Sequence, residues 1–273
     1  MTYQPVVAAT GIVGWNVLNR TMEVQRRAFD ASPDIARDTD YFEARIGEIG
    51  TAEQLVSDRR LLRVALGAFG LGDDINNRAF IRRVLEDGSI EETALANRLT
   101  DSRYKALSKA FGFGDFDTPR TVLSDFGAEI TDRFRRQSFE VAVGVQDDSL
   151  RLALNVEREL VELAGREVTN RVKWLQIMGT PPLREVFETA LGMPPSFGQL
   201  DLDQQLEIFI DRAERQLGTS DISLYGDTDQ LSKLVQRFLL RAQVEEIQTA
   251  STGSVAISML EGAVAFAQSL KVR

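Results

Sequence analysis

Apolar residues recur along this chain at the spacing of a helix. In the segment 118–145, one stripe passes through Val122, Phe126, Ile130, Phe134 and Val141. Intervals of four and seven residues place side chains on one face of an α-helix, whereas a half-buried strand would alternate at every second residue. The stripe therefore predicts a long helix over 119–143.

A second long stripe occupies residues 149–178. It passes through Leu152, Val156, Leu160, Leu163 and Leu175. No alternating run bounded by turn residues is present, so we predict an all-α fold, a multi-helix array of about ten to twelve helices with short connections and no sheet. The expected helices cover residues 12–29, 41–48, 52–69, 76–86, 90–99, 101–111, 119–143, 149–178, 181–191, 202–217, 228–249 and 255–270.

Many of these segments begin with a recognisable capping signal. In a capping box, the side chain at the helix start pairs with a Glu or Gln three residues later. Candidate pairs are Asp40/Glu43, Thr51/Gln54, Ser89/Glu92, Asp201/Gln204 and Asp227/Gln230. Thr118 and Pro119 form another start signal, because an oxygen acceptor followed by Pro suits a helix entry. The signals strengthen the helical prediction.

The pattern divides the chain into three regions. We expect an N-terminal helical region over 1–146 and a C-terminal helical region over 147–250 that packs on it. An apolar helix is expected over 251–273, mobile or docked on a partner, after a hinge-like STGS stretch at 251–254. The pattern leaves open whether the first two regions share one core.

Two glycine-rich stretches invite comparison with a phosphate-binding loop, GAFGLGD at 67–73 and SKAFGFGD at 108–115. A Walker loop needs a preceding strand and a Lys with Ser or Thr after its last glycine, but here Asp73 follows Gly72 and the preceding segment has helical period. A glycine followed by one apolar residue is typical of a helix end, where Gly takes the left-handed conformation and the next residue folds back. We therefore predict structural caps at Gly70, Gly112, Gly144 and Gly192.

The charge of the chain argues against a nucleic-acid partner. Lys and Arg number 32 against 41 Asp and Glu, so the net charge is -9. Proteins that bind nucleic-acid phosphates present a basic face. Adjacent arginines such as Arg135 and Arg136 point about 100° apart on a helix, and we interpret these pairs as solvated or ion-paired.

Histidine and cysteine are both absent. Their absence excludes thiol nucleophiles, disulfides, thiolate or imidazole zinc sites and every triad that needs either residue. Catalysis would rest on carboxylates, Lys, Tyr or a hard metal ion. Asp73, Asp74, Asn76 and Asn77 lie close together, but their spacing is not that of an EF-hand, and a helix start explains them better. We predict no catalytic residue, no metal site and no cofactor.

The two ends of the chain carry broad apolar faces. The candidate contact residues are Trp15, Leu18 and Met22 near one end and Ile257, Leu260, Val264 and Phe266 near the other. Faces this broad are expected to pack against something. Docking on the same chain is the simpler interpretation, and contact with a protein partner or with a second protomer in a homo-oligomer is the alternative.

The sequence has the pattern of neither a cleaved signal peptide nor a membrane span. No basic stretch precedes the apolar residues at the start, so we expect no cleaved signal peptide. No run of 18 apolar residues occurs, so we expect no membrane span. These observations predict a soluble protein.

Several blocks of the chain resemble a known family. They are Gly14-Trp15, DYFEARIGEIGTAEQLVSDRRLLRVALGAFGL (40–71), ANRLTDSRYKALSKAFGFGDF (96–116) and FEVAVGVQDDSLRLALNVEREL (139–160). Together these blocks are similar to an uncharacterised alphaproteobacterial family of unknown function that is typically encoded among flagellar genes. The resemblance implies a structural, assembly or regulatory role connected with the flagellum, and it implies no catalytic or ligand-binding residue.

The leading hypothesis is a non-enzymatic helical protein that acts through protein–protein contacts, with a flagellar component as a possible partner. It would lie in the cytoplasm, or at the flagellum if it is exported. One alternative is a helical enzyme that uses carboxylates and Mg²⁺ or Ca²⁺. Another is an export chaperone, which would expose a groove for an amphipathic helix.

Overall fold

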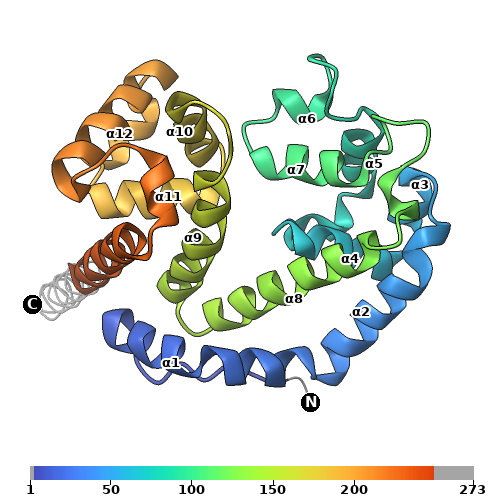
Figure 1. Cartoon of the computed structure of the whole chain (residues 1–273), viewed down its shortest axis with the longest axis horizontal. Coiled ribbons are helices and arrows are strands. Elements are labelled where there is room, and N and C mark those ends of the chain that lie inside the picture. Colours follow the sequence, from blue (N-terminus) through green and yellow to red (C-terminus); the bar gives the residue numbers. More distant parts are fainter. Residues whose placement is uncertain (1–2, 249–273) are drawn as a thin grey trace, which may run out of the picture.

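The computed structural model describes residues 3–248, and these residues are all-α, as predicted (Figure 1). In this part of the chain there are 13 helices and no strand. The helices are α1 (Gly11–Asp30), α2 (Pro33–Arg45), α3 (Ala52–Ser57), α4 (Arg59–Ala68), α5 (Arg78–Glu86), α6 (Leu95–Arg98), α7 (Ser102–Phe111), α8 (Phe126–Gly144), α9 (Asp148–Ala164), α10 (Asn170–Met178), α11 (Pro181–Leu191), α12 (Leu202–Leu217) and a last helix over 228–248.

The helices form two lobes on either side of a hairpin made by α8 and α9 (Figure 1). In the first lobe α4 and α2 pack on α8, and in the second lobe α11 and the turn Ile222–Gly226 pack on α9. The buried apolar residues from Trp15 to Leu239 make one connected core. The boundary expected between residues 146 and 147 falls in the short turn of the hairpin.

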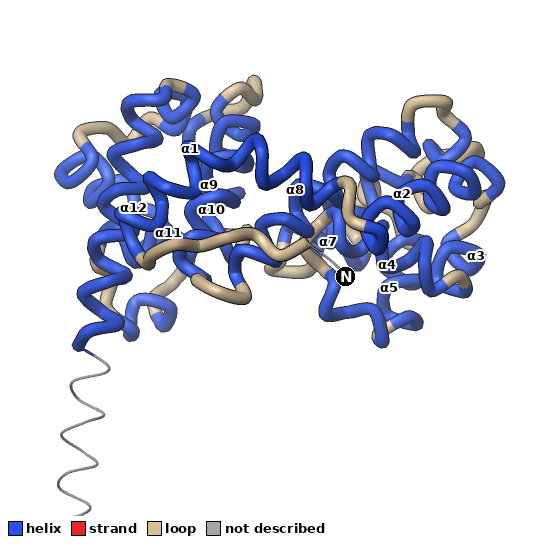
Figure 2. The backbone as a smooth tube through the Cα atoms, turned by 90° about the horizontal axis from the view of Figure 1, so that it is seen from below, coloured by secondary structure: helices blue, strands red, loops and turns tan. Residues whose placement is uncertain are grey.

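The helix α1 crosses both lobes and packs on α8 and α9 (Figure 2). The segment before α1 is tied to it through Gln25, whose Oε1 accepts from the Val6 N–H at 2.6 Å and whose Nε2 donates to the Val6 carbonyl at 3.2 Å. Gln146, in the hairpin turn, donates to the carbonyl of Pro5. These bonds hold the start of the chain against the hairpin.

The two lobes are bridged a second time, between the start of α7 and the turn after α10. The Ser102 N–H donates to the Gly179 carbonyl at 2.7 Å, and the hydroxyls of Ser102 and Thr180 lie 2.8 Å apart. The relative position of the lobes is therefore fixed at this point as well as at the hairpin.

Two of the expected long helices are each divided in two. The segment 52–69 breaks at Asp58, whose Oδ1 accepts from the Arg60 and Leu61 N–H groups and so starts α4. The segment 149–178 breaks after Ala164, because the buried Lys173 donates to the Ala164 carbonyl at 2.7 Å and closes the end of α9. Both breaks depend on side chains that the periodicity of apolar residues does not report.

Three other helix boundaries were wrong. The helix expected over 119–143 begins only at Phe126, because Thr121 bonds to the distant Ile49 carbonyl at 2.6 Å and holds Arg120–Val122 in a separate 3-10 turn. Of the helix expected over 90–99, only the single turn α6 (Leu95–Arg98) is present. The helix expected over 41–48 is instead α2, which starts at Pro33 and is followed by a 3-10 turn.

The expected capping boxes have mixed outcomes. Thr51 and Gln54 form the complete reciprocal pair. Asp201 and Asp227 precede helices, although no bond from Gln204 or Gln230 completes either box. The predictions at Asp40 and Ser89 are wrong. Asp40 lies inside α2, and Ser89 lies in a turn.

The Ser89 turn is held by a carboxylate from elsewhere in the chain. Asp115 accepts from the Ser89 hydroxyl at 2.7 Å and from the Ile90 N–H at 3.0 Å. Because Asp115 is 26 residues away, the capping pattern at Ser89 gave no indication of this contact.

Candidate functional site

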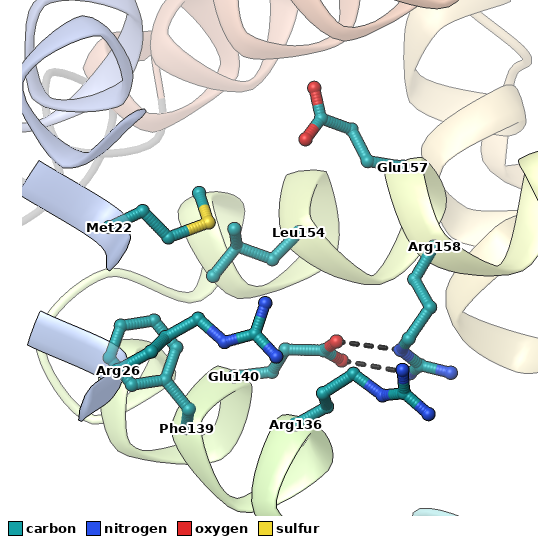
Figure 3. A pocket seen from close by; sticks show the side chains of 8 residues that line it. All are labelled: Met22, Arg26, Arg136, Phe139, Glu140, Leu154, Glu157 and Arg158. Carbon is teal, nitrogen blue, oxygen red and sulfur yellow. Dashed lines mark hydrogen bonds and ion pairs between the residues drawn. The ribbon is translucent and has the colours of Figure 1, made fainter. Parts of the chain in front are cut away.

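A pocket of about 240 Å³ with both charged and apolar side chains in its lining lies where α1 crosses the α8–α9 hairpin (Figure 3). We call it the junction pocket. Its lining comes from all three helices and consists of Met22, Arg26, Arg136, Phe139, Glu140, Leu154, Glu157 and Arg158. None of these side chains carries a hydroxyl or an amine, so carboxylates and guanidiniums are the only groups that could handle protons or charge there.

The centre of the junction pocket is an ion pair between α8 and α9. Arg158 binds Glu140 through two bonds, Nε to Oε1 at 2.8 Å and Nη2 to Oε2 at 3.0 Å (Figure 3). Arg158 also pairs with Glu159 and donates to Gln137. Burial alone would lower the pKa of Arg158, but its bonds to Glu140 and Glu159 raise it overall. The Arg158 guanidinium therefore stays charged, and its bonds to Glu140 join the two halves of the hairpin.

Two other charged side chains of the junction pocket, Arg136 and Glu157, take no part in this ion pair. Arg136 is exposed and forms no ion pair with any residue between 3 and 248. Burial raises the pKa of Glu157, whose carboxylate points away from the Glu140–Arg158 pair (Figure 3). The Glu157 carboxylate thus lies apart from the central pair, and the pocket shows no pair of facing carboxylates that could act as acid and base.

A second hollow of about 450 Å³ shares Arg136 and Arg158 with the junction pocket. Its other lining residues are Glu129, Arg133, Val161 and Glu162. Arg133 lies 3.4 Å from Glu162, which also pairs with Arg166. The lining of this hollow therefore contains three arginines and two glutamates, so its charges largely offset one another.

The contact residues expected near the start of the chain face inward. Trp15 is 5% exposed and Leu18 is fully buried, so these two side chains belong to the core and offer no surface to a partner. Met22 is partly buried and lines the junction pocket. The simpler interpretation, docking of this helix on its own chain, is the correct one for Trp15 and Leu18.

The contact residues expected near the other end, Ile257, Leu260, Val264 and Phe266, lie outside the described residues. So does the helix expected over 255–270.

Three of the four predicted glycine caps have the left-handed backbone. Gly70 has φ +69°, and the N–H of the buried Leu71 donates back to the Leu66 carbonyl at 2.9 Å, as in a Schellman ending. Gly112 and Gly192 have φ +70° and +62°. The prediction at Gly144 is wrong. Its φ is not positive, and it is the last residue of α8, which continues into the hairpin turn.

The oxygen-rich stretch after Gly70 forms the 3-10 turn Gly72–Asn76. Asp74 accepts from the Tyr104 hydroxyl and from the Asn77 side chain, each at 2.7 Å. Between residues 3 and 248, no group of three or more acidic side chains is placed to hold a metal ion.

Sequence reasoning missed an exposed apolar stripe on the 228–248 helix. Leu240, Val244 and Ile247 follow each other at intervals of four and three, and their exposed fractions are 52%, 52% and 62%. The spacing was visible in the sequence, but any helix shows such a stripe on its core face. Only the structure shows that the core uses a different face of this helix, through Leu234, Val235 and Phe238.

The fold and its pockets define an all-α protein with two lobes on a helical hairpin and an ion-paired junction. The chain belongs to a family described as protein of unknown function (DUF1217), whose model matches residues 68–232. The crystal structure of a protein from Agrobacterium tumefaciens, AGR_C_984, is similar, with a TM-score of 0.72 and 25% sequence identity over 89% of this chain and 97% of that one.

A comparison with curated proteins finds no match. None of the helices between residues 3 and 248 combines the length and the apolar character that a membrane span requires.

Proposed function

We propose that the protein acts without catalysis, through contacts with other proteins, as a structural, assembly or regulatory factor of the flagellum. The observation that carries the proposal is the exposed stripe of Leu240, Val244 and Ile247. Three large apolar side chains in a row on one helix face are typical of a surface that a partner covers. The flagellar setting rests on the family resemblance of the sequence blocks.

The stripe can be tested by replacing all three of its residues with serine. The matched control replaces Val13, Val24 and Val145, which are 61%, 71% and 78% exposed on other surfaces, with serine. We expect the stripe variant to lose association, measured as mass in solution, and to swim like a strain that lacks the gene. The control should behave like the wild type. Thermal melts should show both variants folded, since serine in an exposed helix position costs only about 0.5 kcal/mol per residue.

A truncated chain ending at residue 250 tests the rest of the terminal region. If this truncation and the stripe variant both leave the mass in solution and the swimming unchanged, a contact role for the end of the chain is wrong. A rise in melting temperature with Mg²⁺ or Ca²⁺ would instead favour the enzyme hypothesis, because a ligand that binds the folded state raises its stability.

A further inference from the structure

Three arginines meet at the carboxyl end of α11. Arg212, from α12, donates to the carbonyls of Leu191 at 3.1 Å and Gly192 at 2.7 Å. Arg237, from the 228–248 helix, donates to the Ala190 carbonyl at 2.8 Å. The third is Arg241, one helical turn beyond Arg237. The three side chains thus come from two elements and gather on a third.

Arg241 lies against Gly192, the residue that ends α11. A β-carbon added to Gly192 would lie 2.3 Å from Nη1 of Arg241, so the guanidinium lies directly against the glycine. Unlike Arg212 and Arg237, Arg241 donates no hydrogen bond to any residue between 3 and 248. Its five donors are available to another molecule.

No carboxylate of the described residues pairs directly with this cluster. None of the three arginines forms an ion pair within the described part of the chain. The end of α11 supplies about half a negative charge through its carbonyls, which offsets only part of the three positive charges. Burial and the neighbouring Arg241 both lower the pKa of Arg237, as expected where like charges are close. The three arginines therefore form a local positive cluster in a protein whose net charge is -9.

The arginines border the exposed stripe. Residues three or four apart are neighbours on a helix surface, which places Arg237 beside Leu240 and Arg241 beside Val244. The surface therefore combines a row of apolar side chains with a row of cations along one edge. We call these six residues the terminal-helix surface: Arg212, Arg237, Arg241, Leu240, Val244 and Ile247.

We propose that the terminal-helix surface docks an amphipathic helix of a partner protein whose apolar stripe is flanked by Asp or Glu. The proposal rests on the proposed function and specifies the chemistry of the partner. Apolar side chains of the incoming helix would cover Leu240, Val244 and Ile247. Its carboxylates would pair with the arginines, and Arg groups bind carboxylates through two parallel bonds.

The charges around the surface favour a helix over an anionic membrane. α12 exposes Glu207, Asp211 and Glu214 close to Arg212 in sequence. A broad anionic bilayer would approach these carboxylates as well as the arginines, whereas a helix about 10 Å wide can bind along the arginine edge alone.

The test uses the full chain and three fluorescent synthetic peptides of about 18 residues, or five helical turns. The first, the Glu peptide, carries Leu at intervals of three and four with flanking Glu. The second has Lys in place of each Glu. The third has the same residues as the Glu peptide in shuffled order. We expect the Glu peptide to bind at least tenfold more tightly than the other two in fluorescence anisotropy. Raising the salt concentration from about 50 to about 500 mM should weaken the binding of the Glu peptide, because salt screens the attraction between exposed charges.

Arg241→Glu is the diagnostic variant, because Arg241 supports no bond of the fold. We expect it to weaken binding of the Glu peptide about tenfold. Arg241→Lys keeps the charge but loses the two parallel bonds, so it should weaken binding by less than Arg241→Glu does. Arg20→Glu makes the same charge change at an exposed, unpaired position on α1 and should leave the dissociation constant within about twofold.

Three results would overturn the proposal. They are equal affinity for the Glu and Lys peptides, no binding of any peptide, and an Arg241→Glu variant that binds like the wild type. Co-sedimentation with phosphatidylglycerol vesicles but not with neutral ones, abolished by Arg241→Glu, would assign the surface to membranes instead. The proposed function survives each of these results if the serine variant of the stripe still loses association and swimming.

Discussion

At the scale of single residues, the backbone at Gly70 explains the stretch that resembles a phosphate loop. A left-handed φ at Gly70 allows Leu71 to fold back into the core, and the Gly70 carbonyl accepts from Arg103. Gly72, two residues later, has ordinary φ and no other atoms near the position of a β-carbon. Only one of these two glycines therefore requires the absence of a side chain.

This difference predicts the effect of valine at the two positions. Gly70→Val should lower the free energy of unfolding by about 1–2 kcal/mol, because a branched side chain disfavours the left-handed conformation. Gly72→Val should leave it nearly unchanged. Chemical denaturation of both variants measures the difference, and equal stabilities would contradict the cap at Gly70.

At the scale of elements, Asp58 decides where α3 ends and α4 begins. Burial raises the pKa of Asp58, but hydrogen bonds from the Tyr41 hydroxyl and from the N–H groups of Leu61 and Arg60 lower it by more, so the net shift is downward. A group whose pKa is lower in the folded state stabilises the fold above its unfolded pKa. That contribution disappears as the pH falls through the folded pKa.

The break at Asp58 therefore predicts a pH-dependent stability. Asp58→Ala should lose about 1 kcal/mol at neutral pH through loss of the cap. The difference in stability from the wild type should narrow as the pH falls below the ordinary pKa of an Asp side chain, about 4, and through the lower pKa that Asp58 has in the folded state. Asp58→Asn keeps a capping oxygen but loses the charge. At neutral pH its free energy of unfolding should lie between those of the wild type and Asp58→Ala. A constant difference between pH 7 and pH 3 would show that the charge of Asp58 has no part in the cap.

At the scale of the whole molecule, the Glu140–Arg158 pair joins α8 to α9 and thus one lobe to the other. The Glu140 side chain is 7% exposed and that of Arg158 is 18% exposed. A buried ion pair adds little net stability compared with apolar residues, but removal of one partner leaves an isolated buried charge.

Arg158→Met should accordingly destabilise the protein by roughly 3 kcal/mol. The double variant Arg158→Met, Glu140→Leu should recover most of that loss, because Glu140 is the more buried of the two carboxylates that Arg158 pairs with and its charge is removed. Thermal or chemical unfolding of the two variants and the wild type measures both effects. If the double variant is as unstable as the single one, the loss comes from packing and not from the charge of Glu140.

The sequence by itself determined the features that depend on residues a few positions apart. The all-α class, the ends of α11 and α12, the Thr51/Gln54 box and the cap at Gly70 all follow from the backbone preferences and hydrogen bonds of near neighbours. These interactions operate within one or two turns, and so they can be read along the chain.

Only the tertiary structure decided which faces are buried and which side chains meet. Trp15 and Leu18 were expected as possible contacts but lie in the core, whereas Leu240 and Val244 have a similar spacing and are exposed. Asp115 closes the turn at Ser89, Lys173 ends α9, and Arg212 and Arg241 both reach the end of α11. Each of these contacts joins elements brought together by folding. A helical stripe indicates that a face is apolar, but only the packing of the whole chain determines whether the core or a partner covers it.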